Sequence, residues 1–214
     1  MLPRLAIFDM DGLIFDSERL FSSELAKTMN GYGYTLTDEN YIRTLGRSLD
    51  DARMLMKEMY GDDYPFDEIS ALTRERVSKM TPQIKPGIIG LLDFFRGNDV
   101  KCCVASSTAR RYVLKNLTDS GLNEYFSFVI GGEAVGRSKP EPDIFLAALK
   151  HDGDQISPAE ALVLEDSESG VRAAINAGIP VICIPDMKEL PKELLPKTLF
   201  TAKSAFEVRT FFRD

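Results

Sequence analysis

The segment Leu5-Ala6-Ile7-Phe8-Asp9-Met10-Asp11-Gly12 decides the fold, because an apolar run leads directly into two carboxylates and a glycine. An apolar run next to a glycine turn is typical of a central strand in an α/β sheet. Asp9 and Asp11 are two residues apart, so on an extended chain their side chains face the same way. Two like charges about 4 Å apart repel by roughly 4 kcal/mol at an effective dielectric constant near 20. A proton or a cation must therefore compensate them.

The rest of the chain divides into two kinds of pattern. From Pro86 onward, apolar runs alternate with helical spacing, which predicts a doubly wound parallel sheet of the α/β class. The further strands are expected at 100–105, 126–130, 161–164 and 180–184, with a weaker one at 198–200. Between the first strand and Pro86, apolar residues recur only at helical spacing. We therefore expect an α/β core domain of residues 1–15 and 86–214, with an all-helical domain of residues 16–85 inserted into it.

Composition excludes several classes of function. The net charge is −7, which argues against nucleic acid as a partner because a phosphate backbone needs a basic footprint. No apolar stretch has the length that spans a bilayer. The three cysteines form no Cys-x-x-Cys pair, and free thiols in a reducing cytoplasm are expected. The single histidine, His151, follows a predicted helix, where a cationic side chain is favourable without any catalytic role.

Polar side chains follow each of the first four predicted strands. Ligands of open parallel sheets bind beyond the carboxyl ends of the strands, so these side chains are expected to gather at one edge. After the first strand come Asp9 and Asp11. The later strand ends add Ser106, Ser107 and Thr108, then a loop with Lys139, and then Glu165, Asp166 and Ser167.

These residue types point to the chemistry of a phosphate ester. Four carboxylates beside one lysine would repel a phosphate, and a divalent cation reverses this; Mg²⁺ prefers one or two carboxylates, waters and a phosphate oxygen. Asp9 and Asp166 could hold it, with Glu165 as a direct or an outer ligand. The hydroxyls and N–H groups of Ser106 and Ser107 open a helix and would form a phosphate cradle. Lys139 would neutralise phosphoryl oxygens, leaving one aspartate of the pair to attack phosphorus and the other to move a proton.

Four short motifs in this order resemble those of the haloacid dehalogenase superfamily. They are Asp9-Met-Asp-Gly12, the strand end Ser106-Ser107, Ser138-Lys139-Pro140 and Glu165-Asp166-Ser167. The helical insert resembles the small C1 cap of subfamily IA, and the longer phrases after Lys139 and Leu164 resemble its β-phosphoglucomutase-like branch. By this resemblance, Asp9 is the nucleophile and Asp11 the general acid and base. The resemblance further implies that Ser106, Ser107 and Lys139 bind the phosphoryl group, and that Mg²⁺ is surrounded by Asp9, the Asp11 carbonyl, Glu165 and Asp166.

Two contrasts within the superfamily narrow the reaction. The dehalogenases lack the second aspartate, so Asp11 favours an oxygen leaving group that needs a proton. The mutases usually carry a cap arginine and a histidine near the cap entry, where this chain has Leu49 and Phe21. The loop Gly46-Arg47-Ser48 is a candidate for substrate selection, although it also has the composition of an ordinary helix–helix turn. These departures favour a phosphatase over a mutase.

The sequence therefore predicts a Mg²⁺-dependent phosphatase that hydrolyses small phosphomonoesters, such as sugar phosphates, through an aspartyl-phosphate. A sugar phosphomutase is the alternative enzyme, and a non-catalytic binding protein that keeps the fold is the alternative of another class. We expect a cytoplasmic monomer that acts on a small molecule and has neither nucleic acid nor membrane as a partner.

Overall fold

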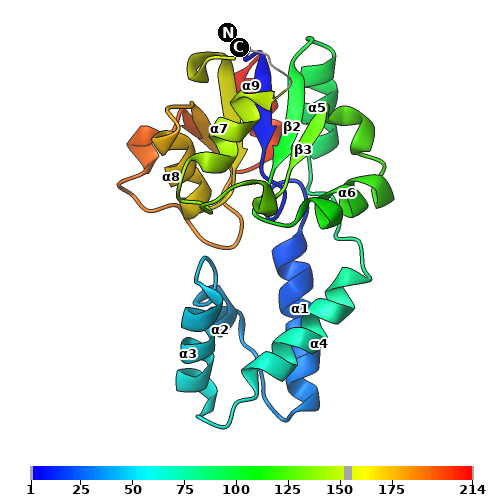
Figure 1. The fold of residues 1–214 in the computed structure, drawn as a ribbon, viewed down its shortest axis with the longest axis vertical. Coiled ribbons are helices and arrows are strands. Elements are labelled where there is room, and N and C mark those ends of the chain that lie inside the picture. The colour runs from blue at the N-terminus through cyan, green and yellow to red at the C-terminus, as the bar shows by residue number, and fades with distance from the viewer. Residues whose placement is uncertain (1, 152–155, 214) are drawn as a thin grey trace. The chain divides into compact units, whose positions relative to one another are not determined.

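The computed structural model describes residues 2–151 and 156–213. In this part of the chain, six strands form one sheet in the order β3-β2-β1-β4-β5-β6, and every neighbouring pair is parallel (Figure 1). The strands are β1 (Leu5–Phe8), β2 (Lys101–Ala105), β3 (Phe128–Ile130), β4 (Ala161–Glu165), β5 (Val181–Cys183) and β6 (Phe200–Thr201). Strand order reverses at β1, which lies between β2 and β4 and places its carboxyl end at the topological switch point.

Both faces of the sheet are covered by helices, which explains why β1 is apolar at every position. Phe8 packs into a cluster with α5 (Ile88–Arg96), α6 (Arg110–Asp119) and α9 (Ala205–Phe211). Ile7, pointing the opposite way, packs into a second cluster with α7 (Asp143–Leu149) and α8 (Glu168–Asn176). Successive side chains of a strand point to opposite faces, so a strand that is covered on both sides shows a continuous apolar run.

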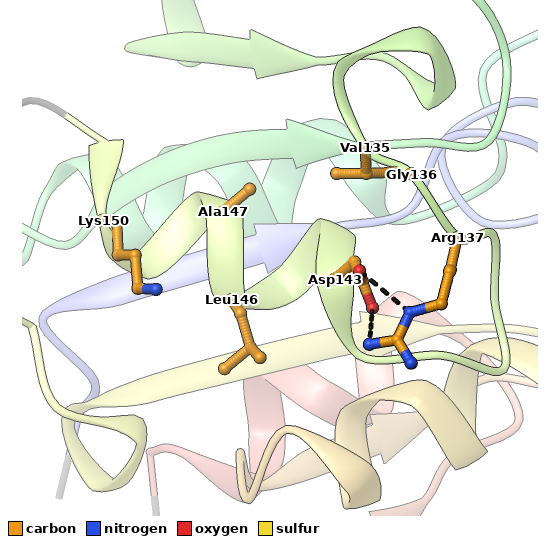
Figure 2. Close-up of a pocket in the computed structure, with 7 residues that line it drawn as sticks. All are labelled: Val135, Gly136, Arg137, Asp143, Leu146, Ala147 and Lys150. Atoms are coloured by element: carbon orange, nitrogen blue, oxygen red, sulfur yellow. Dashed lines mark hydrogen bonds and ion pairs between the residues drawn. The ribbon is translucent and has the colours of Figure 1, made fainter.

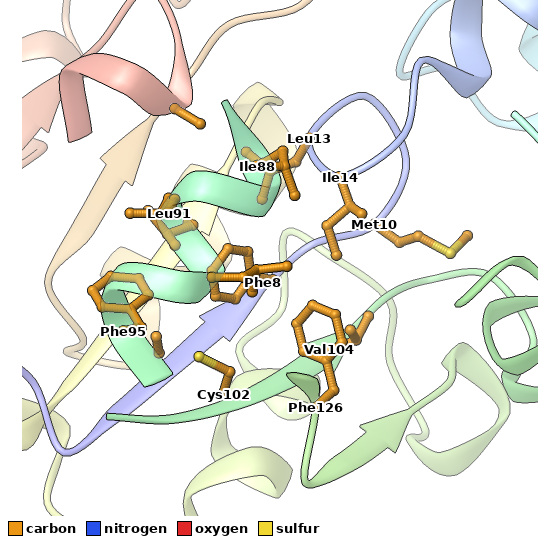
Figure 3. Close-up of a cluster of buried hydrophobic side chains, with 14 of the residues drawn as sticks. Phe8, Met10, Leu13, Ile14, Ile88, Leu91, Phe95, Cys102, Val104 and Phe126 are labelled. Carbon is orange, nitrogen blue, oxygen red and sulfur yellow. The ribbon is translucent and has the colours of Figure 1, made fainter. Parts of the chain in front are cut away.

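Aromatic rings anchor the first cluster behind the switch point. The Phe8 ring meets Phe95 and Phe126 edge to face, with centroids 6.1 and 5.6 Å apart (Figure 3). Met10, Leu13 and Ile14, from the loop that follows β1, join the same cluster. The loop that carries Asp9 and Asp11 is therefore fixed by packing on one side.

The chain divides into two compact units, Met1–Asp16 with Gln83–Asp214, and Ser17–Pro82. The second, the helical unit, contains α1 (Ser17–Gly31), α2 (Asp38–Ile42), α3 (Leu49–Tyr60) and α4 (Phe66–Ser78). Within it, α1 and α3 both pack against α4, and the rings of Tyr34 and Tyr60 pack against the buried Tyr64. A local N-cap marks the beginning of α2, where the hydroxyl of Thr37 accepts a hydrogen bond from the N–H of Asn40.

The two chain segments that lead to the helical unit run side by side within the first unit. The N–H of Asp16 donates to the carbonyl of Gln83, and the N–H of Lys85 donates to the carbonyl of Ile14. The Lys85 ammonium also forms an ion pair with Asp186, whose side chain is almost completely buried in the loop after β5. These contacts hold both connections against the end of the sheet.

The predicted fold class is confirmed, with small shifts at element ends. Strand β3 begins at Phe128, two residues later than expected, because Asn123–Tyr125 forms a 3₁₀ turn before it. The weak strand expected at 198–200 is displaced to Phe200–Thr201, since Leu195–Lys197 takes a 3₁₀ turn. Among residues 2–151 and 156–213, no helix combines the length and apolar character needed to cross a bilayer.

Candidate active site

Asp9, Lys139 and Glu165 lie in direct contact at the carboxyl edge of the sheet. The Nζ atom of Lys139 is 2.5 Å from Oδ1 of Asp9 and 2.6 Å from Oε1 of Glu165. The same nitrogen lies 3.4 Å from the carbonyl oxygen of Ala105, at the end of β2. All three charged side chains are buried, with the carboxylate of Glu165 only 1% exposed. Residues from the end of β1, from β4 and from the loop before α7 thus meet at one point.

Burial and charge shift the ionisation of this group strongly. Burial, together with the negative charges of Glu165 and Asp11, raises the pKa of Asp9 to about 7, against the lowering effect of Lys139. Burial alone would lower the pKa of Lys139, but the carboxylates of Asp9 and Glu165 raise it above its ordinary value. Lys139 is therefore a permanent cation, and one ammonium is shared by two carboxylates. The site carries an excess of negative charge.

Glu165 uses both of its oxygens within the protein. Its Oε1 accepts from Lys139, and its Oε2 accepts from the N–H groups of Asp166 and Ser167 and from the Ser167 hydroxyl. Burial would raise the pKa of Glu165, but Lys139 and these donors lower it below its ordinary value. The contacts of Glu165 are those of a residue that holds Lys139 in place.

Asp11 is oriented by a residue that the sequence analysis did not select as a site residue. The Thr108 hydroxyl donates to Oδ2 of Asp11 at 2.7 Å, and the Ser106 hydroxyl lies 3.5 Å from the same oxygen. The Ser106 hydroxyl also accepts the N–H of Thr108 at 3.0 Å, which closes a tight turn. Ser106 is buried, whereas the Ser107 side chain is exposed and has no hydrogen bond within the described part of the chain. The Ser107 side chain is therefore the one in this turn that is accessible to a ligand.

Asp166 lies against the backbone of the first motif. A Cβ atom built on Gly12 would come within 2.2 Å of Oδ2 of Asp166, and the φ angle of Gly12 is +80°. Glycine is thus required here both by backbone conformation and by the approach of a carboxylate. Burial raises the pKa of Asp166 well above its ordinary value, and the charges of Glu165 and Asp9 add to this.

The donor set fits a hard divalent cation. No three His, Cys, Asp or Glu side chains in residues 2–151 and 156–213 are grouped so that they alone would hold a metal ion. Mg²⁺ needs less, because it is usually bound by one or two carboxylates and completes its shell with waters and substrate oxygens. Asp9 and Asp166 are two such carboxylates, and burial, together with the neighbouring carboxylates, raises the pKa of each.

The residues expected to select the substrate belong to the helical unit. Gly46 has a φ angle of +75°, and Arg47 donates from Nε to the carbonyl oxygen of Arg43. The Ser48 hydroxyl caps α3 by accepting the N–H of Asp51. These contacts are those of a helix–helix turn, and the part played by Gly46, Arg47 and Ser48 in substrate selection stays a prediction.

Two other features are separate from this cluster. A shallow pocket lies between the loop after β3 and α7, but its Arg137 is already paired with Asp143 at 2.9 Å (Figure 2). None of the expected site residues lines this pocket. His151 is exposed and stacks on Phe128 with ring centroids 3.8 Å apart, just beyond the end of α7. The imidazole therefore has a packing role.

Similarity to known proteins identifies the family of this chain. The family model of haloacid dehalogenase-like hydrolases matches residues 6–184, which include Asp9, Lys139 and Glu165. This protein belongs to the haloacid dehalogenase-like hydrolase family. The expected family is thus confirmed on a match that covers most of the chain.

Two relatives of this hydrolase are named as phosphatases. It is 29% identical to a phosphorylated carbohydrates phosphatase of Thermotoga maritima over 81% of each chain. It is 33% identical to a probable pseudouridine-5'-phosphatase of Drosophila melanogaster, over 84% of this chain and 80% of that protein. Among solved structures, a putative beta-phosphoglucomutase from Thermotoga maritima matches with a TM-score of 0.80 and 28% identity over 98% of each chain.

Proposed function

We propose that this hydrolase cleaves small phosphomonoesters, such as sugar phosphates, in two steps through a phosphorylated Asp9. The observation that carries the proposal is the pairing of Asp9 with Lys139 beside a second aspartate that is held separately by Thr108. An attacking carboxylate and a proton carrier are thus supplied by different, independently positioned groups. The named phosphatase relatives support the same reaction class.

In the first step, a carboxylate oxygen of Asp9 forms a bond to phosphorus while the ester P–O bond breaks. The leaving alkoxide takes a proton from Asp11, which the Thr108 hydroxyl keeps aimed through Oδ2. In the second step, water attacks phosphorus, Asp11 takes its proton, and the bond between Asp9 and phosphorus breaks to release inorganic phosphate. Covalent catalysis of this kind divides one difficult transfer into two easier ones.

The groups around Asp9 would balance the negative charges of the carboxylate and of the phosphoryl oxygens. Lys139 keeps the Asp9 carboxylate oriented and would offset the charge of the phosphoryl oxygens, while Glu165 holds Lys139. Ser106 and Ser107 would receive the phosphoryl oxygens at the end of β2. Mg²⁺, held by Asp9, the Asp11 carbonyl and Asp166, would supply electrostatic stabilisation of the transferring phosphoryl group. In this assignment Glu165 is an outer carboxylate rather than a direct ligand.

The helical unit would act as a cap that excludes bulk water, with its hinges in the paired segments around residues 14–16 and 83–85. Small metabolites would be admitted when the cap opens, and large phosphoproteins would not fit beneath it. The three cysteines are free and buried, which fits a reducing cytoplasmic location.

The decisive experiment is a screen for phosphate release from sugar and nucleotide monophosphates, with Mg²⁺ and with a chelator. We expect Mg²⁺-dependent release from a subset of small esters. Asp9→Asn should fold normally and lose steady turnover by about 10⁴-fold or more, because it removes the nucleophile. Measurable steady hydrolysis by that variant would refute the role of Asp9. Hydrolysis nowhere in the panel would favour a binding protein.

A sugar phosphomutase is the second candidate, favoured by the likeness to the putative beta-phosphoglucomutase structure. A mutase must retain the released sugar phosphate and exclude water, whereas a phosphatase must admit water. Incubation of a sugar monophosphate with a sugar bisphosphate activator separates the two. Isomerised phosphosugar would support the mutase, and free phosphate supports the hydrolase.

A further inference from the structure

The loop between β2 and α6 (residues 106–109) lies directly against the segment that follows β3. The N–H of Ser106 donates to the carbonyl of Ile130, and the N–H of Gly132 donates to the carbonyl of Thr108. The approach is too close for side chains, because a Cβ on Gly131 would lie 2.3 Å from the Arg110 nitrogen. A Cβ on Gly132 would likewise lie 2.2 Å from the Ser107 carbonyl oxygen. Two backbones are thus packed on each other along this loop.

Glu133 completes this contact at the start of α6. Both of its carboxylate oxygens accept the N–H of Arg110, at 3.0 and 3.1 Å. The N-cap residue of α6 is Ala109, whose methyl side chain cannot accept a hydrogen bond from the first turn of the helix. A helix leaves its first N–H groups without partners inside the helix, and a carboxylate there is also favoured by the helix dipole. Glu133 therefore supplies, from a different segment of the chain, an acceptor for the first N–H group of α6.

We propose that Glu133 is a positioning residue that fixes the Ser106–Thr108 turn for catalysis, an inference that rests on the proposed phosphatase function. The turn carries the exposed Ser107 side chain and the Thr108 hydroxyl, which donates a hydrogen bond to Asp11. Because Arg110 follows this turn by two residues, its anchored N–H sets where the turn ends. Glu133 does not touch Asp9 or Asp11, so it acts only through the turn.

The two consequences of losing this cap differ in kind. A loosened turn would bind the phosphoryl group less well, which raises KM and weakens inhibition by inorganic phosphate. It would also release the Thr108 hydroxyl from Asp11, which lowers kcat. If the Glu133 carboxylate served only stability, its removal would lower the melting temperature and leave KM unchanged.

The test uses the full chain in three variants. Glu133→Ala should raise KM and the inhibition constant of inorganic phosphate by about tenfold, equivalent to about 1.4 kcal/mol. Glu133→Gln keeps an oxygen acceptor and removes a negative charge, so its KM should match or fall below that of the wild type. Glu124→Ala removes an exposed glutamate near the other end of α6 and should behave as the wild type. Hydrogen exchange of the Arg110 amide should accelerate in Glu133→Ala alone.

Opposite outcomes overturn the inference. Wild-type KM and phosphate inhibition in Glu133→Ala would refute it, as would a rise in KM of the same size in Glu124→Ala. Failure of the proposed function is recognised separately, since the wild type would then hydrolyse no ester in the screen. In that case, an Arg110 amide that exchanges equally in Glu133→Ala and wild type would overturn the cap itself, and faster exchange in the variant would support it.

Discussion

The Nζ atom of Lys139 lies between Oδ1 of Asp9 and Oε1 of Glu165, at 2.5 and 2.6 Å, and all three side chains are buried. One positive charge thus compensates two negative ones in a region from which water is largely excluded. Removing one partner from such a group is costly, because the remaining charges have already lost their hydration.

Lys139→Met should destabilise the protein and abolish phosphate binding. The neutral side chain leaves the carboxylates of Asp9 and Glu165 buried without their shared cation, which we expect to cost about 3 kcal/mol of unfolding free energy. Urea denaturation at neutral pH measures this loss. Lys150→Met, on an exposed lysine beyond α7, is the matched control and should change stability little. Equal stability of the two variants would contradict the charge balance described here.

The stability of the metal-free protein should depend on pH through Asp9. Burial raises its pKa from 3.8 to about 7, so the native state binds this proton more tightly than the unfolded state does. The resulting stabilisation is complete below about pH 4 and is lost as pH rises through about 7. Wild-type protein in chelator should therefore lose stability relative to Asp9→Asn between about pH 4 and about pH 7. A difference in melting temperature that stays constant, or grows in favour of the wild type, would contradict the raised pKa.

Thr108→Val should reduce kcat without a large change in KM. The variant keeps the shape of the side chain but removes the hydroxyl that donates to Asp11 at 2.7 Å. A hydrogen bond to a charged group contributes about 1.5–3 kcal/mol, so we expect a loss of about tenfold or more in kcat. The pH profile of kcat should shift as well, since Asp11 is the proposed proton carrier. Thr118→Val, on the exposed side of α6, is the control, and an equal effect there would remove the role of Thr108.

The neighbourhood of Asp9, Lys139 and Glu165 could be predicted from sequence because topology alone brings strand ends together. An apolar run that ends in a charged residue identifies both the strand and the edge at which its polar side chain emerges. A large separation in sequence does not prevent such a prediction, since Lys139 is 130 residues from Asp9 and still forms an ion pair with it. The functional roles of these residues remain predictions.

Thr108 was expected at the edge of the sheet, but neither its contact with Asp11 nor the contact of Glu133 with Arg110 could be predicted from the sequence, for a physical reason. A threonine after a strand has a hydroxyl that satisfies several local partners, and only the folded turn directs it to Asp11. Glu133 caps a helix that begins 23 residues earlier, whereas capping patterns in sequence are read within three or four residues. Glu165 could be recognised as a site residue, but its four hydrogen-bond donors became visible only in the structure.

Gly12→Ala tests the geometry of the first motif independently of any charge. The new methyl group would have to occupy space 2.2 Å from Oδ2 of Asp166, and it would strain a backbone with a φ angle of +80°. Because Asp166 must move or the loop must shift, we expect weaker binding of Mg²⁺, measured by calorimetry, and a loss of activity of about 10²-fold from misplacement at the site. Gly46→Ala is the matched control, since it has a similar φ angle of +75° but no atom within 4 Å of the added Cβ. The control should therefore carry the backbone strain alone and keep its metal affinity. If both variants lost metal affinity equally, the close approach of Asp166 to Gly12 could not be the cause.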